Sequence, residues 1–550
     1  MLRGATAMYK NKERSDHIII FTFLMFFQLA IMIPLLSWAG LPTFDDGFQL
    51  SYSRRILNGE IPHRDFISIK PVLTPLIHTI DLLISDNYTF RISRIIVYIQ
   101  DVSIILLTYL ILRRNCKAFL LRENLLLCLI GLLLLMDYSR SGIAWYTRDA
   151  VFMGVAGLYL IQSENIYISY AGFFLVGLAP LAKQSFGLFP LSAIVLSKPK
   201  KQLYSFLLIC SGPLIYLFSL LYFSALNDFI LQIRSQSQLS FIFRTGCNPI
   251  AAGLFLIAGY GLAFIANKFD TNKLFVKFML VSGAIFCITV PLVWGQSNAS
   301  KSWFTFYFII GWFIRSRPGN YELSWPVIIV PMVLAWSSSL AFFHTTMSYM
   351  GLWLFAMGTY LIFSHIRNSS DLRFYFILIS FILTAADFIY IRTSLHAMTF
   401  GEPGISAVKY PLDHIVPGAS GIYTSEKKFQ IYRDIHDSVD ILNSKGLKPI
   451  ILPDITFWNA MNTTKNPVPI DWPFFMELAN DELRNRFEKS VVGLKDSHGL
   501  ILHNDPFIDE KKFSEYGGPA YNAMWRRILN QFPVKQTIGR VVIYRISEKR

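Results

Sequence analysis

Long apolar runs separated by short polar stretches fill the first part of the chain. The first run covers about residues 18 to 39, and as a helix it would be roughly 33 Å long, enough to cross the apolar core of a bilayer. Further runs begin near residues 91, 123, 149, 166, 185, 203, 250, 274, 303, 324, 348 and 373. The pattern predicts a polytopic α-helical membrane protein of about thirteen transmembrane helices, with the N-terminus in the cytoplasm and the C-terminus outside.

From about residue 393 the pattern becomes that of a small soluble α/β domain. An amphipathic helix is expected at 425–446, and "KPIILP", "HGLILH" and "RVVIYRI" are typical of buried strands. Helices are also expected near 474–489 and 521–531. We therefore divide the chain into a membrane part, 1–392, and an extracytoplasmic domain, 393–550. No Gly-rich phosphate loop follows these strands, so the domain gives no sign of binding a nucleotide.

Composition agrees with a membrane protein and explains the positive charge. Of the 550 residues, 53% are hydrophobic and 16% are charged, and the net charge is +15. The segment 393–550 holds 20 Lys or Arg and 18 Asp or Glu, which leaves +13 in the membrane part. That excess lies in short stretches between apolar runs, such as "RRNCKAFLLR" and "KPKKQ", as the positive-inside rule requires. Nucleic acid is therefore not an expected partner.

Two adjacent carboxylates, Asp45 and Asp46, open the expected first outer loop, about 40–90. One interpretation is structural, because Thr43 and Asp46 have the spacing of a capping box at a helix start. The other is chemical: acids at a low-dielectric boundary can share a raised pKa, coordinate a divalent cation, or take a proton from an attacking hydroxyl. Both interpretations can hold together.

Cations gather on the same outer side of the expected membrane. Each alone is explained as a snorkelling or helix-terminal charge, but together they favour a phosphate site. The loop at 453–473 is polar and aromatic. A Trp or Asn in it could stack on or hydrogen-bond a sugar, or the segment could be a surface loop anchored by a Trp. The cations are Arg54, Arg55, Arg64, Lys70, Arg140, Arg148 beside Asp149, Lys183, Arg234 and Arg244.

The segment "FDDGFQLSYSRRILNGEIPHRDFISIKPVLTPLIH" resembles the first outer loop of bacterial GT-C glycosyltransferases, the group that includes protein O-mannosyltransferases and the aminoarabinose transferase of lipid A. The shared pattern is an acidic pair before Gly, then "R-x-I-L-N-G-E-I-P-x-R-D", then "K-P". The later segments "SRSGIAWYTRDAVFMGVAGLYL" and "APLAKQSFGLFP" are also similar to the family. The chain departs from it in having "PVL" after Lys70, where two prolines are usual, and His63 where an aromatic is frequent.

The resemblance implies an enzyme of the bacterial inner membrane that moves a sugar, with inversion, from a polyprenyl-phosphate donor to an envelope glycan, lipid or protein. It implies Asp45 as the base, with Asp46 supporting it or helping to hold a divalent cation, the one cofactor left open. Lys70 would neutralise the donor phosphate. The other substrate-binding candidates are Arg64, Arg148, Asp149, Lys183 and Gln184. The alternatives are a transporter or flippase of lipid-linked saccharide, which would carry its charges near the bilayer midplane, and a non-catalytic membrane anchor.

Overall fold

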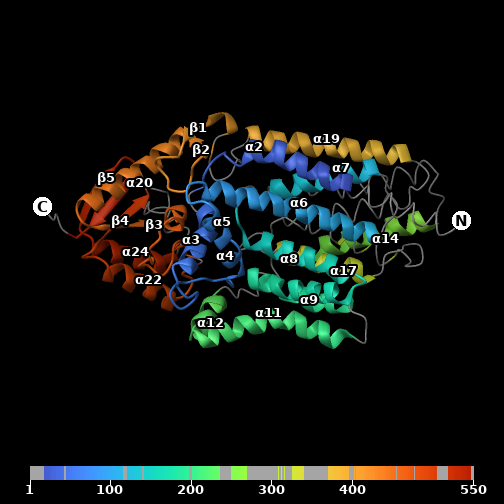
Figure 1. Ribbon diagram of the computed structural model, residues 1–550, viewed down its shortest axis with the longest axis horizontal. Helices are drawn as coiled ribbons and strands as arrows, with labels where there is room; N and C mark the ends of the chain where they lie inside the picture. The colour runs from blue at the N-terminus through green and yellow to red at the C-terminus, as the bar shows by residue number, and fades with distance from the viewer. Residues whose placement is uncertain are drawn as a thin grey trace.

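The computed structural model places a bundle of helices at one end of the molecule and a mixed sheet with its helices at the other. The first-loop helices lie between them: α3 (Asp45–Leu57), α4 (Leu73–Ile77) and α5 (Thr79–Ile84) (Figure 1). The described residues are 18–42, 45–115, 121–138, 142–196, 201–235, 249–268, 307–308, 311, 315, 325–339, 370–394, 402, 404–453, 455–475, 477–503 and 518–546.

The helices of the bundle pack closely where the sequence provides small residues. At the contact between α8 and α9, a Cβ on Gly157 would lie 2.7 Å from the carbonyl oxygen of Gly172, so a larger side chain would push the helices apart. The turn between them ends at Asn165, whose side chain accepts from the backbone N–H of Tyr167 at 2.9 Å and so caps α9. The elements are η1 (Gln28–Met32), α2 (Ile33–Leu36), α6 (Thr89–Asn115), α7 (Leu121–Tyr138), α8 (Tyr146–Ile161), α9 (Ile166–Ala182), η2 (Gln184–Phe186), α10 (Leu188–Ala193), η3 (Ile194–Leu196), α11 (Gln202–Tyr222), α12 (Leu226–Ser235), α14 (Pro249–Lys268), α17 (Trp325–Ser339) and α19 (Ser370–Ser394).

The prediction of about thirteen transmembrane helices is wrong. Among the described residues, only two helices are long and apolar enough to cross a membrane, Thr89–Leu112 within α6 and α11. The apolar runs near 149, 166 and 185 do not become full spans, because the chain breaks them into helices of 16 and 17 residues and a series of short turns. Helices of that length reach only about 24–26 Å. The runs expected from 274 and 348 lie outside the described residues, as does most of the run from 303.

The first loop contributes three helices, α3 (Asp45–Leu57), α4 (Leu73–Ile77) and α5 (Thr79–Ile84). Helix α3 lies against α21 (Thr456–Ala460) of the C-terminal part so closely that a Cβ on Gly47 would fall 2.1 Å from the backbone nitrogen of Phe457. The glycine of "FDDGF" is therefore required by packing. It fixes the start of the first loop against the C-terminal part.

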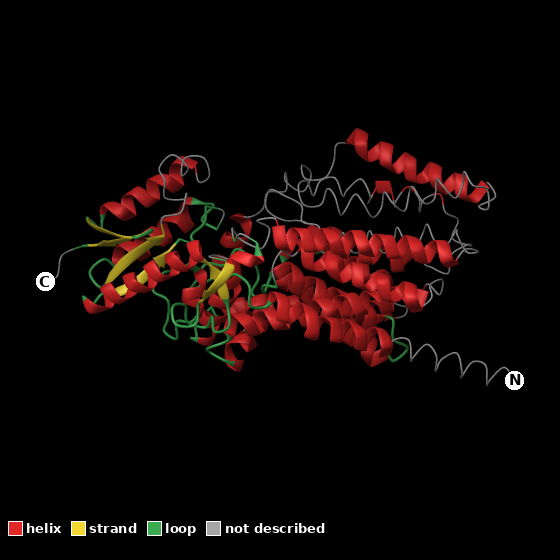
Figure 2. Cartoon of the chain, turned by 90° about the horizontal axis from the view of Figure 1, so that it is seen from above, coloured by secondary structure: helices red, strands yellow, loops and turns green. Residues whose placement is uncertain are grey.

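The C-terminal part holds a four-stranded sheet in the order β3-β4-β6-β5, in which β3 and β4 are parallel and the other neighbours antiparallel. Alternate residues cover its two faces: Ile501 and Ile543 pack with α20, whereas Leu500 and Leu502 pack with α22 and α24. Figure 2 shows the strands lying among these helices. The elements are η7 (Ile405–Ala407), β1 (Val408–Pro411), β2 (Tyr423–Ser425), α20 (Glu426–Ser444), β3 (Lys448–Leu452), α22 (Asp481–Gly493), β4 (His498–His503), α24 (Gly518–Asn530), β5 (Val534–Ile538) and β6 (Val541–Arg545).

The predicted elements of this part are largely confirmed. The amphipathic helix is α20, which has Ile435 and Leu442 buried and Gly446 just beyond its end at φ +69°. The three predicted strands are β3, β4 and β6. The helix expected from residue 474 begins only at Asp481, after the N-cap Asn480, so the residues before it form a loop. The short antiparallel pair of β1 and β2 was not predicted.

Candidate functional site

The acidic pair lies at the start of α3. Asp46 is only 1% exposed, and Arg94 of α6 donates to its carboxylate from Nε at 3.1 Å and from Nη2. Burial raises the pKa of Asp46, and the Arg94 guanidinium opposes that shift. Arg94 also donates to the carbonyl oxygens of Ser37 and Gly40. Asp46 therefore holds α3 against α6. The predicted cap Thr43 and the side chain of Asp45 lie outside the described residues.

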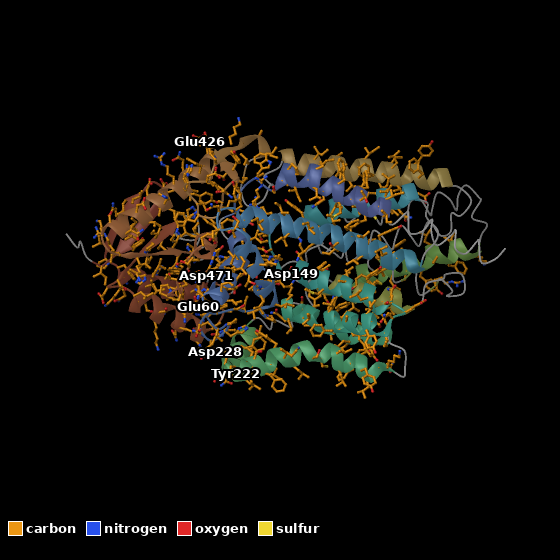
Figure 3. The ribbon with its side chains drawn as sticks, in the orientation of Figure 1. Glu60, Asp149, Tyr222, Asp228, Glu426 and Asp471 are labelled. Atoms are coloured by element: carbon orange, nitrogen blue, oxygen red, sulfur yellow. The ribbon has the colours of Figure 1, made fainter. Side chains whose placement is uncertain are left out.

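Two of the first-loop arginines join this loop to the C-terminal part. Arg55 is 2% exposed and donates from Nε to Asp471 at 2.7 Å, from Nη1 to Glu60 at 2.8 Å, and from Nη2 to the carbonyl oxygen of Val468 at 2.5 Å. Arg54 donates to the carbonyl oxygen of Ala460 at 3.0 Å. Figure 3 shows Glu60 and Asp471 together where the two parts meet. These arginines connect segments that lie about 400 residues apart in the chain.

Two other predicted cations lie on the surface. Arg64 is exposed and pairs with its neighbour Asp65 at 2.9 Å, so the structure does not bring it into the buried cluster described next. Arg234 is exposed near the end of α12. Arg140 and Arg244 lie outside the described residues.

Lys70 and Lys183 meet at the first two residues of α8. The Nζ atom of Lys70, a buried residue, lies 4.3 Å from the ring centroid of Tyr146 and 5.5 Å from that of Trp145. The Nζ atom of the partly buried Lys183 donates to the hydroxyl of Thr147 at 2.9 Å. Burial lowers the pKa of Lys183 to about 7, and the nearby charge of Lys70 acts in the same direction. Both cations thus stand at the helix end that carries positive partial charge.

Gln184 supports the position of Lys70. Its amide donates to the carbonyl oxygen of Ile69 at 3.3 Å, and the Ser68 hydroxyl donates to the carbonyl oxygen of Lys70 at 2.8 Å. The predicted Lys-Gln segment therefore acts in two ways. Lys183 brings a charge to the start of α8, and Gln184 holds the backbone that carries the other charge.

Arg148 and Asp149 enter a buried ion network behind these lysines. Asp149 accepts from the amide of Gln100 at 3.0 Å and lies 3.4 Å from Nε2 of His78, whose Nδ1 is 2.7 Å from Asp81. Although burial alone lowers it, Asp149 and Asp81 raise the pKa of His78 to about 10, so the imidazole is charged at neutral pH. The side chains of His78, Asp81 and Asp149 are 0% exposed. Figure 3 labels Asp149 near the start of α8.

Arg148, the other residue of this pair, contacts α6. Its Nε atom lies 2.8 Å from Asp101, and its Nη1 donates to the carbonyl oxygen of Ile143 at 2.8 Å. Arg148 and Asp149 therefore fix the first turn of α8, on which Lys70 and Lys183 rest. Their observed contacts are those of positioning residues.

Glu477 is a candidate that the sequence did not reveal. It comes from the loop before α22, is 3% exposed, and its Oε2 makes no hydrogen bond within the described part of the chain. Burial raises the pKa of Glu477 to about 7, against the opposing charge of Lys70. The loop lies in a stretch that we expected to be helical, and no local pattern links it to Lys70. A buried acid beside a buried lysine is a signal that only the fold provides.

An aromatic cluster joins these groups. Phe48, Tyr52, Phe66 and Tyr146 are buried together, and the half-buried Trp472 packs against them with its ring centroid 5.1 Å from that of Phe48. Trp472 belongs to the polar and aromatic loop 453–473, for which the sequence leaves open both a sugar-binding residue and a surface loop with an anchoring Trp. The structure places this tryptophan against the aromatic cluster that includes Tyr146, the ring that Lys70 contacts.

Comparisons with known proteins found no match. No family model matches the chain, and no curated protein matches it. Within the described residues, no group of three or more His, Cys, Asp or Glu side chains has an arrangement that could hold a metal ion.

Proposed function

We propose that the protein is a membrane-bound glycosyltransferase that takes its sugar from a polyprenyl-phosphate donor. The observation that carries the proposal is the meeting of Lys70 and Lys183 on Tyr146 and Thr147, at the N-terminus of α8. Two ammonium groups in a partly dry site repel each other, and an anion between them removes that repulsion. A phosphate accepts hydrogen bonds from both, and the helix end adds to the attraction.

In the proposed reaction, the oxygen of an acceptor hydroxyl forms a bond to the anomeric carbon while the bond from that carbon to the donor phosphate breaks. The bonding pair leaves with the polyprenyl phosphate, and Lys70 and Lys183 stabilise the charge that develops there. The hydroxyl proton passes to a carboxylate. By the family resemblance this base is Asp45, the first residue of α3, and the acceptor is an envelope glycan, lipid or protein.

The surface of α11 supports a membrane location. Its side chains are mostly apolar yet exposed, with Ile215 61%, Phe218 65% and Tyr222 83% accessible. Figure 3 labels Tyr222 near one end of this helix. Exposed apolar surface of this extent on a helix of spanning length fits contact with lipid. We place the enzyme in the bacterial inner membrane, with the first loop and the C-terminal part on the outer side.

The test measures sugar transfer directly. Purified protein in nanodiscs receives undecaprenyl phosphate carrying a radiolabelled sugar, together with cell-envelope acceptors, and release of undecaprenyl phosphate is followed. We expect Lys70→Met to lower kcat/KM by about 10²-fold or more, and Asp45→Asn to abolish transfer. The control is Lys489→Met, which changes an exposed lysine on α22 and leaves both lysines of the site intact.

Two results would contradict the proposal. One is transfer that does not depend on Lys70. The other is movement of the intact lipid-linked sugar across the membrane without release of undecaprenyl phosphate, at equal rates in wild type and Asp45→Asn. That second result would identify a flippase.

A further inference from the structure

Two buried polar side chains near the lysines, Gln49 and Glu477, have polar atoms that lack a hydrogen-bond partner within the described residues. Gln49 of α3 is 0% exposed, and within the described residues its amide has no hydrogen-bond partner other than the hydroxyl of Tyr146. Oε2 of Glu477, which comes from the C-terminal part, makes no hydrogen bond within the described residues. Most buried polar atoms in proteins are paired, and an unpaired one is costly. These two side chains therefore point to a ligand that supplies the partners.

Both side chains lie around one residue, Tyr146. Gln49 and Ser68 lie beside its hydroxyl, and Glu477 interacts electrostatically with it. The ring of the same tyrosine carries the ammonium of Lys70 at 4.3 Å. A group bound by Gln49 and Glu477 would thus be adjacent to a phosphate held by Lys70. This is the relation between the sugar and the phosphate of the proposed donor.

The surroundings of the two side chains are aromatic. Phe48 lies one position before Gln49 on α3, and its ring centroid is 5.0 Å from that of Tyr52 and 5.1 Å from that of Trp472. Aromatic rings offer an apolar surface with a polar tip, which fits the C–H face of a sugar. A carboxylate accepts hydrogen bonds from hydroxyl groups, and an amide both donates and accepts. A second phosphate does not fit here, because the Glu477 carboxylate would repel it.

We propose that Gln49 and Glu477 bind the hydroxyl groups of the transferred sugar, so that the C-terminal part completes the donor site formed by the first loop and α8. The inference rests on the proposed function and names the place of the sugar within it. It also gives the C-terminal part a direct role in substrate binding. A carboxylate about 400 residues from Lys70 in the chain becomes part of the same site.

The experiment separates sugar binding from phosphate binding. Undecaprenyl phosphate alone, and the same lipid carrying glucose, galactose, mannose or arabinose, are titrated against the full-length protein in nanodiscs. In wild type, we expect at least one sugar to tighten binding about tenfold or more over the bare lipid phosphate. Glu477→Gln and Gln49→Leu should lose most of that gain while binding the bare lipid phosphate with at least wild-type affinity.

The variants are chosen so that folding does not decide the result. Gln49→Leu keeps the approximate size of the side chain and removes a buried amide whose one partner within the described residues is the Tyr146 hydroxyl, and Glu477→Gln keeps the shape and removes a charge. Glu488→Gln, on the outer side of α22, is the matched control and should retain the full gain. Retained Lys70-dependent binding of the bare lipid phosphate shows that each variant is folded.

Three outcomes are distinct. Full retention of the sugar-dependent gain by both variants would overturn the inference, and so would a wild type that binds no sugar of the panel better than the bare lipid phosphate, which would leave water as the partner of these atoms. Neither of these results would touch the phosphate site. Binding of the bare lipid phosphate that does not depend on Lys70 would instead overturn the proposed function, and the inference with it.

Discussion

Two clusters of buried charge share the aromatic cluster of Phe48, Tyr52, Phe66 and Tyr146, and they differ in balance. In the first, Arg55 faces two carboxylates at 2.7 and 2.8 Å and lies over the ring of Phe66. In the second, two cations, Lys70 and Lys183, contact a ring and a hydroxyl, and burial raises the pKa of the acid beside Lys70, Glu477, to about 7. The first cluster is complete and joins two parts of the fold. The second is the phosphate site that we propose.

The largest effect should follow from breaking the complete cluster. Arg55→Met removes the cation and leaves the carboxylates of Asp471 and Glu60 buried beside each other. Loss of one partner from a buried pair costs about 3–5 kcal/mol, so we expect a clear fall in the midpoint of thermal unfolding in detergent. Arg527→Met, which breaks an exposed pair with Glu488, is the control and should change little. Equal midpoints for the two variants would remove the distinction between the clusters.

A variant of the second cluster should show the opposite pattern. Lys183→Met removes a cation that burial and Lys70 both disfavour, so the midpoint of unfolding should stay the same or rise. Sugar transfer should nevertheless fall, with kcat/KM lower by about 10²-fold, because the leaving phosphate loses one of its cations. Stability and activity are measured on the same preparation. A variant that is both inactive and strongly destabilised would show that Lys183 is a structural residue.

The smallest effect concerns pH. Because the pKa of Lys183 is about 7, this side chain loses its proton as the pH rises through neutrality, and the KM for the donor should rise by about tenfold for each pH unit above it. Unfolding restores an ordinary lysine pKa, so the unfolded chain binds more protons between about pH 7 and 10.5, and the contribution of Lys183 to stability should rise over that range.

The pH effect has a direct control. Lys183→Arg keeps the charge at all these pH values, so the part of the rise in KM that comes from Lys183 should be lost, and its KM should rise less steeply than that of wild type. A donor KM that is independent of pH in wild type would mean that the phosphate does not depend on the charge of Lys183.

The C-terminal part was predicted well because its signals are local. Strand β4 is buried along its whole length, and α20 has a regular apolar stripe. Strand β5 was missed because its residues alternate between exposed and partly buried, as at a sheet edge, and its apolar pattern is weak. The loop that carries Glu477 was taken for helix because its apolar residues continue into α22, although Asn480 marks the true start.

The sequence offers the individual charged residues but not their partners. It indicates Lys70 and Lys183 as cations of the same side, and the structure brings them close together. The contacts of Arg55 with Asp471 and of Asp46 with Arg94 join positions far apart in the chain. Long-range pairs leave no periodic signal. The span count failed for a related reason, since hydropathy measures the length of an apolar run and not where the helices within it begin and end.

The contact at Gly47 has a consequence for protein engineering. Because only a glycine at position 47 leaves room for the backbone of Phe457, α3 and α21 must match each other closely in shape. A fragment ending before residue 393 would expose to solvent the surface of α3 around Gly47 and the Arg55 side chain, which both contact the C-terminal part. Chimeras made by exchanging the C-terminal part should therefore take α3 and α21 from the same parent.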